Sequence, residues 1–342
     1  MTEIVRILIV DDSAYVRKVI RQMLSRSPFL EVVGTARDGR EALELTEELK
    51  PDVVTCDLIM PELDGLGFIT AQMARRPVPI VVVSVASESG EQVLAALDAG
   101  AVDFVQKPTA LATDRVLEIA EELIAKVKSA ASSRPAISSS APVAIVARPA
   151  QASAVDVVVI GISTGGPQGL KRVIPRLPAE LAVPIAIVLH MPVGYTELYA
   201  RTLNEQSALT VLESQGGEVV TKGHVYLAPA GRHLTLRRTG TGEVVTHLDV
   251  RPLDTPYRPS VDTLFQSAAD AYGSRVLGIV MTSMGADGRE GAAWIKAKGG
   301  TVLTESEASC VVYGMPRSIV EAGLSDEEVM LDRMADALMA RV

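Results

Sequence analysis

The segment VVVIGISTGGPQG (residues 157–169) passes from a continuous apolar run into a glycine-rich turn. Such runs are typical of buried parallel strands, and a glycine turn directly after the strand leads into a helix in α/β folds. The turn has two interpretations: it holds the phosphates of a nucleotide, or it exposes a serine nucleophile. The choice depends on which other groups reach the same edge of the sheet.

The dinucleotide pattern G-x-G-x-x-G fits this turn poorly. It requires a glycine where the chain has Ser163, and a carboxylate at the end of the next strand, IAIVLH, which ends in His190 instead. Histidine is a poor partner for a ribose, but it is the usual general base for a serine nucleophile. The frame G-x-S-x-G, from Gly161 to Gly165, therefore favours Ser163 as a nucleophile.

A serine and a histidine need a carboxylate to orient the imidazole ring. The stretch VLGIVMTSMGADG places Asp287 in a glycine loop just beyond another apolar strand. Because Asp-Gly is also a turn signal, a purely structural turn or cap role for Asp287 stays open at this point. His190 alone lies at an expected parallel strand end. Locally bonded or solvated rings are expected in a turn-rich segment for the other three histidines, His224, His233 and His247.

Length and composition indicate a soluble protein of two domains. The chain has 342 residues, of which 48% are apolar and 22% charged, with a net charge of −9. No apolar run reaches the roughly 18 residues of a membrane span, and the two cysteines offer no disulfide framework. We therefore expect a cytoplasmic protein that binds no nucleic acid and does not insert into a membrane. An Ala/Ser/Pro-rich stretch predicts a linker over 126–153, between domains at 1–125 and 154–342.

The hydrophobic pattern predicts the same fold class for both domains. Five strand-helix units in the first 125 residues indicate a doubly wound parallel sheet. The second domain repeats the alternation, so a second doubly wound parallel sheet is expected. Its segment 209–250 is rich in turns and β-branched residues, which predicts antiparallel hairpins added to one edge of that sheet. Trp294, the only tryptophan, is expected in the core.

Polar groups follow four of the five expected strands of the first domain. Asp11 and Asp12 follow the first strand, Asp57 the third, Ser84 the fourth and Lys107 the fifth. Three carboxylates in one crevice repel one another unless a hard cation lies among them, which predicts a Mg²⁺ site. The lysine and the hydroxyl would bind a phosphoryl group on Asp57. Singly, each residue has an ordinary alternative as a helix cap, a strand-end hydroxyl or a turn.

Together, the segments VDDS, CDLIMPELDG and DFVQKP resemble the receiver domain of two-component response regulators over residues 1–125. The resemblance implies a flavodoxin-like (βα)5 fold, phosphorylation at Asp57 and a switch pair formed by Ser84 and Phe104. It also implies that Lys107 binds the phosphate. The implied Mg²⁺ ligands are Asp12, Asp57 and the Ile59 carbonyl, with Asp11 acting through water.

The segments GISTGGP, HMP, GHVYLAP, RPSVD, MGADG and YGMPRSI resemble the catalytic domain of chemotaxis protein-glutamate methylesterases over residues 154–342. The resemblance implies hydrolysis of γ-glutamyl methyl esters on methyl-accepting chemotaxis receptors, deamidation of receptor glutamines in many members, and phosphate supplied by the histidine kinase of the chemotaxis system. The catalytic group would be Ser163, His190 and Asp287, without a cofactor. We expect the oxyanion donors to be the amides of Thr164 and Met284.

Three residues depart from the pattern of that family. Leu189 stands where a glutamine is usual, Ser283 replaces a loop glycine, and Tyr257 stands where a histidine is usual. None of these changes removes a member of the expected triad, but Ser283 adds a side chain beside the proposed oxyanion amide. Two alternatives therefore stay open: a receiver-controlled hydrolase of another ester or amide, and a catalytically silent interaction module with a non-chemotaxis partner.

Overall fold

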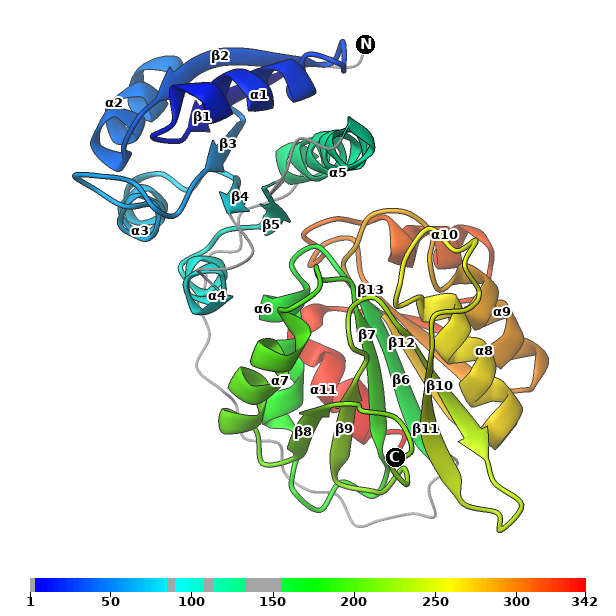
Figure 1. Cartoon of the computed structure of the whole chain (residues 1–342). Helices are drawn as coiled ribbons and strands as arrows, with labels where there is room; N and C mark the ends of the chain where they lie inside the picture. Colours follow the sequence, from blue (N-terminus) through cyan, green and yellow to red (C-terminus); the bar gives the residue numbers. More distant parts are fainter. Residues whose placement is uncertain (1–3, 85–89, 108–112, 133–154) are drawn as a thin grey trace. The chain divides into compact units, whose positions relative to one another are not determined.

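The structure is a computed structural model that describes residues 4–84, 90–107, 113–132 and 155–342 (Figure 1). The chain divides into two compact units between residues 138 and 139. Among the described residues, no helix is both long enough and apolar enough to cross a lipid bilayer.

The first unit is a five-stranded parallel sheet in the order β2-β1-β3-β4-β5, the order of flavodoxin-like folds (Figure 1). Its elements are β1 (Val5–Val10), α1 (Ala14–Leu24), β2 (Leu30–Ala36), α2 (Gly39–Leu49), β3 (Val53–Cys56), α3 (Gly65–Arg75), β4 (Ile80–Ser84), α4 (Gly90–Asp98), β5 (Asp103–Gln106) and α5 (Thr113–Ser132). The central strands β3 and β4 are buried along their whole length, as expected of strands covered on both faces. Helix α5 continues into residues 126–132 of the segment that we assigned to the linker, and residues 133–153 of that segment lie outside the described residues.

The second unit is a seven-stranded parallel sheet in the order β14-β13-β12-β6-β7-β9-β8. Its elements are β6 (Val157–Ile162), α6 (Gly166–Val173), η1 (Ile174–Arg176), β7 (Ile185–Leu189), α7 (Thr196–Glu205), β8 (Thr210–Glu213), β9 (His224–Leu227), β10 (His233–Arg238), β11 (Val244–Asp249), α8 (Val261–Tyr272), β12 (Val276–Val280), α9 (Arg289–Ala297), β13 (Thr301–Glu305), α10 (Met315–Glu321), β14 (Glu327–Val329) and α11 (Leu331–Met339).

The strand order of the second unit reverses between β6 and β12. From β6 the sheet grows through β7 in one direction, and later strands from β12 onward extend it in the other. In open parallel sheets, ligands bind beyond the carboxyl ends of the strands at such a reversal. The turn that follows β6 lies at this point.

The hairpin of the second unit is present, but it is not at the edge of the main sheet as we predicted. Strands β8 and β9 from the turn-rich segment join the sheet in parallel, whereas β10 and β11 form a separate two-stranded sheet in which β10 packs against α8 (Figure 1). The reason is burial: Leu234 and Leu236 of β10 enter the same core as Leu264 and Phe265 of α8. Because a helix already buries the apolar face of the hairpin, the hairpin does not have to join the main sheet to bury it.

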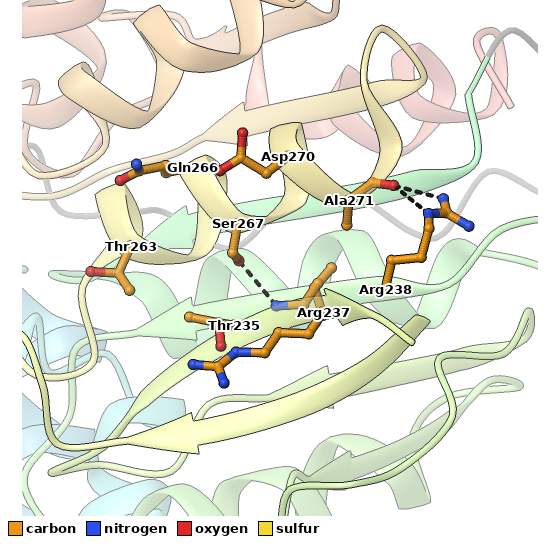
Figure 2. A pocket seen from close by; sticks show the side chains of 9 residues that line it. Thr235, Arg237, Arg238, Thr263, Gln266, Ser267, Asp270 and Ala271 are labelled. Carbon is orange, nitrogen blue, oxygen red and sulfur yellow. Dashed lines mark hydrogen bonds between the residues drawn. The ribbon is translucent and has the colours of Figure 1, made fainter. Parts of the chain in front are cut away.

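A surface hollow of about 500 Å³ lies between β10 and α8 (Figure 2). Two of its polar side chains bond within the fold: Ser267 Oγ accepts a hydrogen bond from the Leu236 amide at 3.0 Å, and Arg238 donates to the carbonyl of Ala271. None of the predicted catalytic residues lines this hollow.

The prediction of a core position for Trp294 is wrong, because its side chain is 43% exposed. The buried stripe of α9 consists of Gly291, Ala292 and Ile295, and Trp294 lies beside that stripe. The residue is nevertheless useful as a single fluorophore within the second unit.

Candidate functional site

The glycines of the opening segment allow close packing around Ser163, which lies between β6 and α6. A Cβ on Gly161 would lie 2.4 Å from Val261, the first residue of α8, and a Cβ on Gly166 would lie 2.5 Å from Leu189. Gly165, which precedes α6, has a φ of +73°, a conformation that other residues rarely adopt. These glycines therefore bring two helices against the sheet and leave Ser163 at its edge.

Backbone hydrogen bonds join the ends of three neighbouring strands at this edge. The Ser163 amide donates to the carbonyl of Thr282, which follows β12, at 3.1 Å. The His190 amide, which follows β7, donates to the carbonyl of Ile162 at 3.1 Å. Ser163 and His190 therefore lie at the carboxyl ends of adjacent parallel strands, as the sequence predicts.

His190 and Asp287 are joined by a side-chain hydrogen bond of 2.9 Å between Nε2 and Oδ2. Because a carboxylate can only accept, Nε2 carries a proton, and in the neutral imidazole Nδ1 then holds the lone pair. Nδ1 is buried and has no hydrogen-bond partner in the part of the chain that the structure describes. The nitrogen available to accept a proton is thus Nδ1, the reverse of the more common template, in which Nδ1 faces the acid.

Asp287 is fixed by the first turn of α8. Its Oδ1 accepts from Ser260 Oγ and from the Asp262 amide, both at 3.0 Å, and its Oδ2 also accepts from the Val261 amide at 2.8 Å. Burial alone would raise the pKa of Asp287, but the contact with His190 and these amides outweigh it and hold the pKa below its usual value. A cap of α8 accounts for the donors from that helix, and the bond to His190 adds a contact that a cap does not require.

His233 holds the loop that carries Ser260. The ring is fully buried, its Nδ1 accepts from the Ser260 amide at 3.2 Å, and its Nε2 donates to the Pro252 carbonyl at 3.1 Å. Burial lowers the pKa of His233, in keeping with a neutral ring that both accepts and donates. This role could not be predicted from the sequence, because His233 follows no parallel strand. His233 begins β10, but the sequence pattern marks this region only as rich in turns.

The two expected oxyanion donors lie in the turns after β6 and β12. Thr164 is buried directly after Ser163, and its carbonyl accepts from Thr282 Oγ1 at 3.0 Å. The Met284 amide donates no hydrogen bond to any residue that the structure describes, so it is available to a ligand. The Ser283 hydroxyl donates to the Met284 carbonyl at 3.0 Å, so this departure from glycine is absorbed inside the loop.

The other two departures from the family pattern differ in position. Leu189 is fully buried and packs against Gly166, which makes it a core residue of β7. Tyr257, in the loop between β11 and α8, stacks on the imidazole of His190 with ring centroids 4.4 Å apart and planes inclined by 11°. Tyr257 therefore touches the candidate general base.

Glu305, at the end of β13, is a buried carboxyl group that supports the same edge of the sheet. It is fully buried, and it accepts from the Thr282 amide at 2.9 Å and from Ser309 Oγ at 3.0 Å. Burial outweighs these hydrogen bonds and raises the pKa of Glu305 to about 7. Near neutral pH, the group therefore changes its charge directly behind the loop that carries Met284.

We expect Glu305→Gln to weaken the dependence of stability on pH. Since the pKa of Glu305 is higher in the folded than in the unfolded chain, the folded state binds more protons between about pH 4.5 and 7. Stability is therefore lost as the pH rises through this window, by a few kcal/mol. Glutamine can still accept from Thr282, but it does not ionise.

The measurement is urea unfolding at pH 5 and pH 7.5, followed by the fluorescence of Trp294, which reports on the second unit. The wild-type chain should lose more free energy of unfolding between the two pH values than the Glu305→Gln variant. Glu290→Gln, an exposed change on α9, is the matched control. An equal loss in all three proteins would contradict the assignment.

The acidic cluster of the first unit is assembled as predicted. Asp11, Asp12 and Asp57 each offer a carboxylate oxygen within 4.8 Å of the others. Lys107 Nζ lies 2.7 Å from Asp11 Oδ2 and 2.7 Å from Asp57 Oδ2. Burial raises the pKa of Asp11, and the hydrogen bond and charge of Lys107 offset this rise only in part. The donor set fits a hard divalent cation such as Mg²⁺.

The predicted switch residues lie on strands next to this cluster. Ser84, at the end of β4, and Phe104, on β5, are both buried, and the Lys107 amide donates to the Ser84 carbonyl at 2.7 Å. Ile59 lies two residues beyond Asp57 with a side chain that is 49% exposed.

Lys126 of α5, which the sequence did not single out, donates to the Phe104 carbonyl at 2.6 Å and to Asp103 at 3.0 Å. A lysine inside a helical pattern gives no signal of such a contact.

Comparison with known families identifies both units. The family model described as CheB methylesterase matches residues 158–338, and the model described as response regulator receiver domain matches residues 7–121. The chain belongs to the CheB methylesterase family. This family member is accordingly a hydrolase that carries a response-regulator receiver, which confirms the function class, the fold class and the resemblance inferred from the sequence.

Similar proteins cover nearly the whole methylesterase. It is 51% identical over 342 residues to protein-glutamate methylesterase/protein-glutamine glutaminase 5 of Myxococcus xanthus (strain DK1622), covering 99% of this chain and 98% of that relative. It is 41% identical over 355 residues to protein-glutamate methylesterase/protein-glutamine glutaminase of Symbiobacterium thermophilum (strain DSM 24528 / JCM 14929 / IAM 14863 / T), covering 99% and 97%.

A solved structure extends the likeness to the fold of the second unit. The crystal structure of the Thermotoga maritima CheB methylesterase catalytic domain matches with a TM-score of 0.54 and 41% identity, covering 55% of this methylesterase and 99% of that chain. The roles of the individual site residues, the bound Mg²⁺ and the domain boundaries at 125 and 153 stay predictions.

Proposed function

We propose that the chain hydrolyses glutamyl methyl esters on methyl-accepting chemotaxis receptors, and that phosphorylation of its receiver by a chemotaxis histidine kinase activates it. The observation that carries the proposal is the hydrogen bond between His190 and Asp287 beside Ser163, at the reversal point of the sheet. The names of the relatives support the glutamyl ester as substrate. A silent interaction module would have no use for an acid-base pair held in this way.

The first half of the reaction forms an acyl-enzyme. Ser163 Oγ attacks the ester carbonyl while its proton passes to His190 Nδ1, and the carbonyl electron pair moves onto oxygen. Amides of Thr164 and Met284 stabilise this oxyanion, each with a contribution on the order of 3 kcal/mol. When the carbonyl re-forms, the bond to the methoxy group breaks and His190 returns the proton to release methanol. Asp287 stabilises the imidazolium between the two transfers.

The second half frees the enzyme by the same route. Water attacks the glutamyl ester of Ser163 while His190 takes a proton from it, and collapse of the intermediate returns that proton to Ser163 Oγ. The product is a glutamate side chain. A receptor glutamine would follow the same path with ammonia as the leaving group, which accounts for a glutaminase activity.

The receiver supplies control through Asp57. Its carboxylate is the phospho-acceptor, and Lys107, 2.7 Å from it, is placed to neutralise a phosphoryl oxygen. Asp12, Asp57 and the Ile59 carbonyl would hold Mg²⁺, with Asp11 acting through water, and the ion would supply charge compensation for the phosphoryl group. Ser84 and Phe104 would pass the change of charge to the surface of the receiver.

We expect Asp57→Asn to abolish both phosphorylation and activation. Asparagine keeps the shape of the side chain but cannot form the acyl phosphate. The measurement is methanol release from methylated receptor, with and without a small-molecule phosphodonor and Mg²⁺, together with hydroxylamine-sensitive labelling of the protein.

The wild-type chain should be labelled and accelerated, and the Asp57→Asn variant should show neither response while keeping its unstimulated rate. Asp52→Asn, an exposed change just before β3, is the matched control. Label that persists on the Asp57→Asn variant would place the phosphorylation site elsewhere. Absence of methanol release in every protein would contradict the proposed substrate.

A further inference from the structure

The stack between Tyr257 and His190 joins two loops that lie far apart in the sequence. His190 follows β7, and Tyr257 comes from the connection between β11 and α8. The centroid distance of 4.4 Å and the inclination of 11° describe a nearly parallel contact of the two ring faces. One face of the candidate base is therefore covered by a phenol ring.

The loop of Tyr257 is fastened on both sides of that residue. Pro252 and Ser260 are tied to the same buried ring, His233, through a carbonyl and an amide. Ser260 in turn donates to Asp287. The stacked tyrosine and the acid that orients the imidazole are consequently held by one connected set of hydrogen bonds.

Tyr257 also reaches the loop of the proposed oxyanion site. A Cβ on Gly285 would lie 3.2 Å from the Tyr257 hydroxyl oxygen, so the phenol lies directly over that glycine. Gly285 has a φ of +78° and follows Met284. Tyr257 thus spans the distance from the base to the loop that offers the free amide.

A flat contact of this kind has two physical effects on an imidazole. It limits rotation of the ring about its Cβ–Cγ bond, which keeps the imidazole in the orientation set by its bond to Asp287. It also places the negative face of an aromatic ring against a group that becomes a cation in each proton transfer. The two effects together are worth a rate factor on the order of tenfold.

We propose that Tyr257 is a positioning residue that acts on His190 through the face of its ring. The inference rests on the proposed esterase reaction, in which His190 is the base. It assigns a role to a residue where this chain departs from the histidine usual in the family. A flat ring at position 257 is therefore the feature that matters.

The test compares four variants of the full-length chain in steady-state methanol release. Tyr257→Leu keeps bulk but has no ring face, and it should lower kcat about tenfold with KM changed by less than about twofold. Tyr257→Phe and Tyr257→His restore a flat ring and should recover most of kcat. Leu253→Ala, an exposed change in the same loop, should match the wild type and controls for disturbance of the loop.

A second readout does not depend on activity. The ring protons of His190, identified by comparison with His190→Gln, should resonate upfield in the wild type because they lie over an aromatic face. This displacement should persist in Tyr257→Phe and vanish in Tyr257→Leu, while the dispersion of the other resonances shows that each variant is folded.

Three results would overturn the proposal: a kcat of Tyr257→Leu within about twofold of the wild type, an equal loss in Tyr257→Phe, or a change confined to KM. A normal ring-proton displacement with no esterase activity in the wild type would instead contradict the proposed function and leave the stack itself established.

Discussion

Ser163→Ala is expected to reduce methanol release by a factor on the order of 10⁵ to 10⁶, down to the rate supplied by binding and the oxyanion donors alone. The change removes the attacking oxygen and nothing else that the fold needs. The backbone hydrogen bonds of the residue, from its amide to Thr282 and from Gly166 to its carbonyl, do not involve the side chain. The unfolding transition should therefore match that of the wild type.

The decisive control for this prediction is a double variant. If Ser163 and His190 act as one unit, Ser163→Ala combined with His190→Ala should be hardly slower than either single variant. Losses that multiply would mean that the two residues act in separate steps. Turnover near the wild-type rate in Ser163→Ala would remove the nucleophile from the mechanism altogether.

Asp287→Asn is expected to lower kcat by about 10⁴-fold. The acid receives hydrogen bonds from His190, from Ser260 and from two amides of α8, so an asparagine must turn its NH₂ group toward one of these donors. If that group faces the imidazole, it donates to Nε2, and the ring proton moves to Nδ1. The lone pair that should receive the proton of Ser163 is then lost.

The same substitution should also reduce stability, since an NH₂ group opposite a backbone amide leaves a buried donor unpaired, at a cost of about 1–3 kcal/mol. Steady-state kinetics and urea unfolding measure the two effects separately. Asp270→Asn, at the far end of α8 and paired with Lys298, is the matched control and should change neither quantity appreciably. A fall in stability with full activity would reduce Asp287 to a cap of α8.

The position of the site could be predicted from the sequence because it follows from the sheet. Continuous apolar runs mark the strands, and parallel strands bring their carboxyl ends to one edge. That argument places Ser163 next to His190 without a structure. It also gathers Asp11, Asp12 and Asp57, and the observed distances agree.

The residues that hold the site in place could not be predicted, because they belong to no periodic hydrophobic pattern. Residues 250–260 belong to an irregular connection, so the contact of Tyr257 with His190 and the bonds of His233 to that loop depend on tertiary packing. Strands β8 and β9 are short and lie in a turn-rich segment, which hid their place in the main sheet. The antiparallel hairpin was predicted, but its separation from the main sheet was not, because the helix that covers it comes from elsewhere in the chain.

The contact between Gly161 and Val261 sets a limit on how this protein can be re-engineered. Random libraries that seek new ester substrates would naturally vary the two segments nearest the nucleophile and its acid. A single added methyl group at Gly161 would meet Val261 and displace the start of the helix whose amides hold Asp287. Diversity is better introduced at exposed positions outside this contact, for example at Val193, where the side chain is 69% exposed. Such variants would keep the catalytic residues in place while the surface that contacts the substrate changes.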